Sequence, residues 1–282
     1  MRSDFAYDPV TAIDESAAVG DTARVFAEIR RVMGIPLVTS IWRGLAGMDD
    51  SLRPAWEAAK PIYESGEPER ALARSVAAAN LPSPEPLAPT ALTCIGITEG
   101  DVRTVRAVIA AYNRSNGLNL MALAALIAPT ATGSGAVLAA DDSEVSPAQW
   151  PPLPPLLPRE AIAAYTWDII RRVNAFGAAG IDAGVATLWR HLAHWPGLLA
   201  LTHCAFAPLQ SRGLIDEANG RLVALGDTEG AHMAHLRATL PTLSPKALAA
   251  ITGYVRSPAQ VARMVVIGHT LDSWLARLIT AP

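Results

Sequence analysis

The residues of this chain best suited to chemistry are two asparagines near its middle, Asn113 and Asn116. A side-chain amide both donates and accepts hydrogen bonds, so either residue could hold a water molecule or a carboxylate. In a second copy of the same pattern the equivalent positions are Val255 and Pro258. One copy has therefore lost the polar pair, as expected if a single site needs it only once. The alternative is helix termination, because Asn116 precedes Gly117 and Asn-Gly often ends a helix.

Asp182 is the second candidate, in a Gly-Ile-Asp-Ala-Gly stretch whose small residues would let a ligand approach closely. An aspartate after a glycine-rich loop more often caps a helix, here one running into residues 185–194. Ser40 and Thr187 occupy equivalent places in the two copies. Their hydroxyls could bind an anion, or they could bond back to the helix carbonyl four residues earlier.

The histidines invite a metal-site interpretation that we consider the weaker one. They form two pairs at helical spacing, His191 with His194 and His232 with His235, and His203 follows the first pair. Two histidines three residues apart can reach one ion. Neither pair has an acidic partner in a known ligand pattern, so we expect no metal. Gly-x-Ser-x-Gly, phosphate-loop and dinucleotide motifs are also missing from the sequence.

An internal repeat must position these residues. Three short segments return in the same order at offsets of 141 to 147 residues: 29–32 as 170–173, 42–46 as 189–193, and 111–116 as 253–258. A unit of this length is too long for a solenoid repeat, which spans about 20–50 residues. We therefore predict two similar halves with the site at their seam. The change in offset places a six-residue insertion at 175–184 in the second half.

Hydrophobic periodicity predicts that both halves are helical. Apolar residues recur at three-and-four spacing, without the alternation of β-strands; the two clearest stripes are Val25, Ile29, Val32 and Met33, and Val102, Val105, Val108, Ile109 and Tyr112. Thr98 with Asp101 predicts a capping box, and Ser244-Pro245 predicts a second helix start. We expect an all-α internal pseudo-dimer, divided into an N-terminal extension (1–19), a first repeat (20–130), a Pro/Gly-rich linker (131–157) and a second repeat (158–282).

These halves, together with two sequence motifs, resemble the group I 2-haloacid dehalogenases. The motifs are Val105-Arg106 followed by Tyr112-Asn113-x-x-Asn116, and Leu192-Ala193-His194-Trp195-Pro196; further echoes are 35–38, 43–46 and 54–56. The likeness covers most of the chain. It implies an all-α pseudo-dimer in which an aspartate activates water, and that water displaces halide from a short 2-haloalkanoic acid. It also implies that no metal or organic cofactor takes part.

Carried over residue by residue, the resemblance makes Asn116 the group that orients the water. The family's aspartate stands seven residues before the Trp-Pro pair, and that position here is Leu188, which cannot accept a proton. The nearest acid is Asp182, which could replace it if the insertion folds back toward the seam. We expect Asn113, Ser40, Thr187, Leu188 and Leu37 to contact the substrate. The competing hypothesis is a non-hydrolytic relative that binds a small carboxylate or a protein partner.

Composition limits the partners and the compartment. The net charge is −3 with no basic block, which argues against nucleic acid. No stretch reads as a membrane span or a signal peptide, and the two cysteines form no disulfide framework. We expect a cytoplasmic protein, with a homodimer possible.

Overall fold

A computed structural model of the chain describes residues 12–88, 90–129, 150–180, 184–238 and 243–280. Every regular element within these ranges is helical, which confirms the predicted all-α class. The α-helices are α1 Gly20–Met33, α2 Ser40–Leu45, α3 Leu52–Glu64, α4 Glu67–Ala78, α5 Ala91–Cys94, α6 Glu99–Ile127, α7 Ala164–Asn174, α8 Thr187–His191, α9 Pro196–Ser211, α10 Leu214–Met233, α11 Pro245–Arg256 and α12 Arg263–Thr280. Across the described residues, no helix has the length and apolar character needed to cross a membrane.

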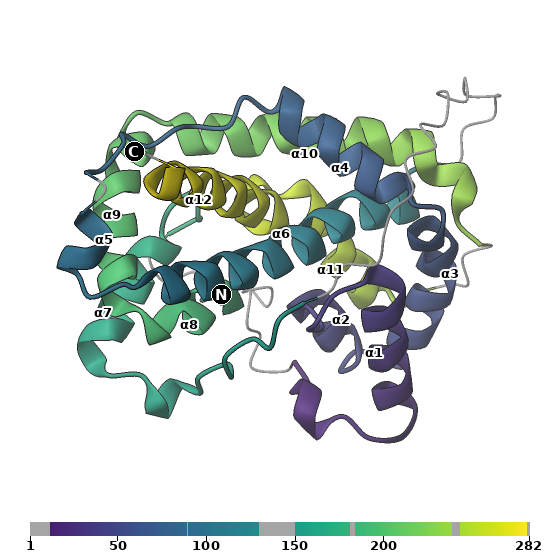
Figure 1. Cartoon of the computed structure of the whole chain (residues 1–282). Coiled ribbons are helices and arrows are strands. Elements are labelled where there is room, and N and C mark those ends of the chain that lie inside the picture. The colour runs from purple at the N-terminus through teal and green to yellow at the C-terminus, as the bar shows by residue number, and fades with distance from the viewer. Residues whose placement is uncertain (1–11, 89, 130–149, 181–183, 239–242, 281–282) are drawn as a thin grey trace.

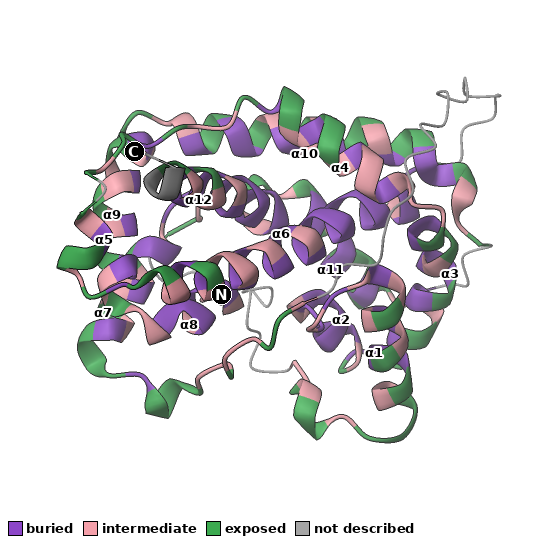
Figure 2. Cartoon of the chain, viewed as in Figure 1, coloured by how far each residue is buried: buried purple, intermediate pink, exposed green. Residues whose placement is uncertain are grey.

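The long helix α6 forms the centre of the molecule, with α10, α12, α4 and α11 around it (Figure 1). The predicted capping box begins it: the Thr98 side chain accepts from the Asp101 amide, and the Asp101 carboxylate accepts from the Thr98 amide. The predicted start at Ser244 and Pro245 is confirmed for α11. Figure 2 shows α6 and α12 buried along most of their length, and the buried apolar side chains of both halves join in one core cluster.

The predicted helix stop at Asn116-Gly117 is wrong, because α6 continues to Ile127. Gly117 is required by packing. A Cβ at this position would lie 2.3 Å from Leu72 Cδ2 of α4, far inside van der Waals contact. The glycine therefore lets α4 approach α6, and Asn116 lies in mid-helix instead of at a terminus.

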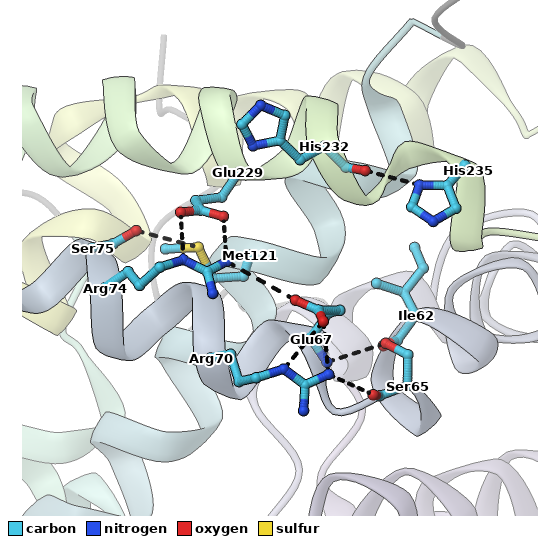
Figure 3. Close-up of polar contacts among 10 residues, drawn as sticks. All are labelled: Ile62, Ser65, Glu67, Arg70, Arg74, Ser75, Met121, Glu229, His232 and His235. Carbon is cyan, nitrogen blue, oxygen red and sulfur yellow. Dashed lines mark hydrogen bonds and ion pairs between the residues drawn. The ribbon is translucent and has the colours of Figure 1, made fainter. Parts of the chain in front are cut away.

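The two halves interlock across α10, which packs on α4 and α6 of the first half. A Cβ on Gly230 would lie 2.8 Å from the backbone carbon of Ala124, so the two helices touch there. The contact between α4 and α10 includes an ion pair at the surface. Arg74 of α4 donates to both carboxylate oxygens of Glu229 on α10 at 3.1 and 2.7 Å (Figure 3).

The predicted repeat pairs the segments of α1 and α2 with those of α7 and α8. Trp42 and Trp189, which it pairs, are both fully buried. The repeat itself and the domain boundaries stay predictions. Two segments outside the predicted repeats pack on these helices: the Ile13 amide donates to the Arg43 carbonyl, and the Trp150 indole donates to the Gly34 carbonyl.

The structure corrects the predicted start of the helix after the insertion. Helix α8 begins at Thr187, with Ala186 in the N-cap position and no side-chain cap. The interpretation of Asp182 as the N-cap of this helix is therefore wrong. Asp182 itself lies outside the described residues, so its predicted role as a base stays a prediction.

Candidate functional site

A pocket of about 610 Å³ is lined by residues of both halves. That volume suits a small-molecule ligand. Its walls come from the N-terminal segment, from α1, from the loop leading into α2, from α6, from the described end of the linker, and from α8 and α12. The lining residues are Asp14, Glu15, Ser16, Arg30, Pro36, Leu37, Val38, Thr39, Ser40, Arg43, Tyr112, Asn116, Leu156, Pro158, Ala186, Thr187, Leu188, Arg190, His191 and Met264.

Most of the residues expected at the site lie in this pocket. Leu37, Ser40, Asn116, Thr187 and Leu188 all line it. Ser40 and Thr187 are the first residues of α2 and α8, so neither has a carbonyl four residues earlier in its own helix. The back-bonding alternative therefore does not apply to them, and both hydroxyls belong to the pocket wall.

Asn113 lies elsewhere. It is absent from the pocket lining, and its Oδ1 lies against α12, where a Cβ on Gly268 would come within 1.9 Å of it. The contact brings α6 and α12 together behind the pocket.

Asn116 has the properties of a ligand-binding amide. Its side chain is only 6% exposed and lines the pocket. Among the described residues it has no hydrogen-bonding partner for that amide. A buried polar side chain normally finds a partner. The Asn116 amide is therefore open to a water molecule or ligand in the pocket.

Two arginines that the predicted repeat pairs with each other contribute to the charge of the pocket. Arg43 on α2 is 8% exposed, and Arg190 on α8 donates through Nε and Nη2 to the Leu157 carbonyl at 3.2 and 2.9 Å. Guanidinium groups match the planar geometry of carboxylates. The lining holds three arginines against two acids, an excess of one positive charge, so the pocket favours an anion.

The two acids come from the N-terminal segment, which no pattern in the sequence connects to the site. Glu15 accepts from Arg30 and from the Val38 amide at 2.8 Å. Asp14 accepts from the Ser16 hydroxyl and amide, and these hydrogen bonds, with the nearby charges of Arg43 and Arg190, lower the pKa of its carboxyl. Both carboxylates already have partners within the chain.

A histidine and a tyrosine form a buried pair in the same pocket. The Tyr112 hydroxyl lies 3.3 Å from Nδ1 of His191, and Nε2 of His191 lies 2.6 Å from the carbonyl oxygen of Pro154. The rings meet edge to face, with centroids 5.9 Å apart. From the sequence alone, His191 was a candidate metal ligand and Tyr112 belonged to an apolar helical stripe.

Comparison with known proteins supports the fold alone. No protein-family model and no curated protein matches the chain. Solved structures do match: a D-2-haloacid dehalogenase with L-LA (15% identity, TM-score 0.68, 97% of this chain and 96% of that one) and a D-2-halacid dehalogenase mutant (17%, 0.66, 97% and 96%). A mutant with D-2-CPA is similar at 14% identity and a TM-score of 0.60, over 96% of each chain. This chain has the D-2-haloacid dehalogenase fold.

Within this dehalogenase fold, Leu188 gives the pocket an apolar wall. It is 1% exposed and stands on α8 between Thr187 and the charged and polar pair Arg190 and His191. The position at which the resemblance led us to expect a catalytic aspartate therefore lines the pocket with a side chain that cannot take a proton. Any proton acceptor must come from another position.

Three of the other histidines have structural partners for their rings. His194 contacts the Pro155 carbonyl through Nε2 at 2.9 Å, and His203 stacks on Phe176. His235 donates from Nδ1 to the His232 carbonyl at 2.8 Å (Figure 3). These contacts account for the spacing of the histidines. In the described part of the chain, no group of three His, Cys, Asp or Glu residues could hold a metal ion.

Proposed function

We propose that this chain is a hydrolase related to the 2-haloacid dehalogenases. It binds a short 2-haloalkanoic acid in the pocket between the halves, and water replaces the halogen at C2 as halide leaves. The observation that carries the proposal is the paired placement of Arg43 and Arg190 in one pocket of a chain with this fold. A small anion is the ligand that such a pocket favours.

Each part of the substrate has a matching surface. The guanidinium groups of Arg43 and Arg190 bind the carboxylate, and the hydroxyls of Ser40 and Thr187 supply further hydrogen bonds. Leu37, Leu188 and Met264 surround the carbon–halogen bond and keep bulk water away from it. The Asn116 amide holds the attacking water, so the substrate and the water are positioned before reaction.

Replacing Arg43 tests the proposal. Arg43→Gln keeps a hydrogen-bonding side chain but removes the charge, and a hydrogen bond to a charged group contributes about 1.5–3 kcal/mol. We expect halide release from 2-chloropropionate with a KM raised about ten- to a hundredfold. Halide release from both enantiomers, followed over substrate concentration, measures this change. The matched control is Arg53→Gln, which removes an exposed arginine of α3 outside the pocket.

Leu188 favours a second candidate function, a non-hydrolytic protein that binds a small carboxylate. The apolar side chain removes a proton acceptor from α8 but leaves Arg43 and Arg190 in the pocket. Calorimetric titration with 2-chloropropionate and with lactate, run beside the halide assay, separates the two. Binding of both acids without halide release from any 2-haloacid would support this second function against the hydrolase.

A further inference from the structure

The pocket must supply a proton acceptor if water is to attack carbon at neutral pH. Among the described lining residues, the candidates other than arginine are Asp14, Glu15, Tyr112 and His191. Glu15 is held by Arg30 and the Val38 amide, and Asp14 is exposed and held by Ser16. The hydrogen bonds from Ser16 stabilise the charged form of Asp14, which lowers its pKa and weakens it as a base. The Glu15 carboxylate is occupied by its ion pair with Arg30. His191 is the group that remains, together with the Tyr112 hydroxyl bonded to it.

The hydrogen bonds of His191 fix its tautomer. A carbonyl oxygen only accepts, so the 2.6 Å contact with Pro154 requires a proton on Nε2. In the neutral ring Nδ1 then carries a lone pair, and the Tyr112 hydroxyl at 3.3 Å donates to it. General-base catalysis uses this arrangement, in which the imidazole is held in place and its unprotonated nitrogen, Nδ1, accepts a hydrogen bond from a hydroxyl group.

The pair also faces the water site. Tyr112 and Asn116 are four residues apart on α6, so their side chains lie on one face of the helix, and both line the pocket. His191 reaches the same pocket from α8 and is 5% exposed. A water held by Asn116 would thus lie beside the Tyr112 hydroxyl.

We propose that His191, acting through Tyr112, is the proton acceptor of the hydrolysis proposed above, on which this assignment rests. The water oxygen forms a bond to C2, and the carbon–halogen bond breaks with its electron pair leaving on the halide. The water proton passes to the Tyr112 oxygen, whose own proton moves to Nδ1 of His191. The imidazolium then returns this proton to solvent, so each turnover yields a hydroxy acid, a halide ion and a proton.

The surroundings keep His191 neutral before reaction. Burial lowers the pKa of its imidazole below the ordinary 6.5, and neighbouring His194 acts in the same direction, whereas the hydrogen bond to Pro154 opposes them. The charged groups of the pocket are Arg30, Arg43 and Arg190 against Asp14 and Glu15, with the substrate carboxylate added on binding. We therefore expect kcat/KM to be level above pH 6.5 and to fall at lower pH.

Two substitutions and a matched control test the assignment in the full chain. His191→Gln retains a donor for Pro154 but has no basic nitrogen, and Tyr112→Phe removes the hydroxyl. Loss of a general base typically costs about 10²- to 10⁴-fold in rate. We expect kcat for 2-chloropropionate to fall at least a hundredfold in each, with KM nearly unchanged and the double variant no slower. His194→Gln removes the imidazole that binds Pro155, the next carbonyl along. It should keep the native rate above pH 7, while the acid limb moves to higher pH because His194 no longer helps to lower the pKa of His191.

The possible outcomes separate this inference from the proposed function. If His191→Gln releases halide at the native rate, the assignment of His191 as the base is wrong, but the proposed hydrolase function is unaffected. The same holds if Asp182→Asn or Asp14→Asn abolishes release while His191→Gln does not. A native chain that binds 2-chloropropionate without releasing halide would overturn both. If His191→Gln does not fold, Tyr112→Phe decides, together with the nitrogen-15 shifts of native His191, which should report a proton on Nε2 and none on Nδ1 at pH 7.

Discussion

Two asparagines three residues apart on α6 show how burial alone fails to separate binding from structural residues. Both are almost completely buried. Asn119 donates to the Thr39 hydroxyl at 2.7 Å and accepts from the Trp42 indole at 3.0 Å and the Tyr63 hydroxyl at 2.8 Å. Both the amide oxygen and the amide nitrogen of Asn119 therefore have partners inside the protein. Asn116, by contrast, lines the pocket, which supports the proposed role of its amide in holding water.

Alanine substitutions at these two positions should therefore have opposite effects. Asn119→Ala leaves three buried polar groups without their partner, each costing about 1–3 kcal/mol, so we expect the free energy of unfolding to fall by about 3 kcal/mol or more. Asn116→Ala loses no protein hydrogen bond, so its stability should change by less than about 1 kcal/mol while halide release falls. Urea unfolding of both variants, beside the halide assay, measures the contrast. Equal destabilisation by the two would mean that Asn116 is a structural residue.

At the scale of elements, local signals predicted the start of a helix where a side chain caps it. The Thr98 and Ser244 caps depend on residues within one turn, and both were found as predicted. The predicted helix end at Asn116-Gly117 was wrong because Gly117 is needed for packing against Leu72, a residue of another helix. No local sequence pattern indicates a contact between residues so far apart in the chain. The same limit explains why the sequence placed Ser40 and Thr187 inside helices that in fact begin with them.

Glycines of α10 give a direct test of packing against helix propensity. Gly230→Ala places a Cβ 2.8 Å from the Ala124 backbone, so α6 and α10 must separate, and overpacking of this kind costs about 1–3 kcal/mol. Gly220→Ala on the same helix meets no atom within 4 Å and should stabilise by up to about 1 kcal/mol. Denaturation midpoints of the two variants should move in opposite directions. A Gly230→Ala protein as stable as Gly220→Ala would show that the contact between α6 and α10 can accommodate an added methyl group.

On the scale of the whole molecule, the pocket was predictable in part. Matching segments in the two halves led to a site where they meet, and Ser40, Asn116, Thr187, Leu188 and Leu37 do line one pocket. Asp14, Glu15 and His191 were not assigned to it. The N-terminal segment has no counterpart in the repeat, and the role of His191 depends on a proline carbonyl in the linker 37 residues earlier. Such long-range partners follow from the assembled fold, not from spacing along the chain.

Burial of two histidines makes the stability of the whole chain depend on pH. Burial lowers the pKa of both His191 and His269 below the ordinary 6.5, which applies to the unfolded chain. As pH falls through 6.5, these two histidines are protonated in the unfolded state but remain neutral in the folded state. The free energy of unfolding therefore decreases with acidification. The lowered pKa values of Glu28, Asp101 and Asp168 add a second decrease only below about pH 4.5.

We therefore expect urea unfolding to give a level free energy above about pH 7 and a decline between pH 6.5 and 5, above the range in which Glu28, Asp101 and Asp168 contribute. His269→Gln removes one of the two proton-binding differences, so its decline in this interval should be shallower than that of the native chain. The control is His232→Gln, which replaces an exposed histidine of α10. A native stability that stays constant from pH 7.5 to 5 would show that His191 and His269 can accept protons without leaving their buried positions, and it would remove the basis for the expected acid limb in the activity profile.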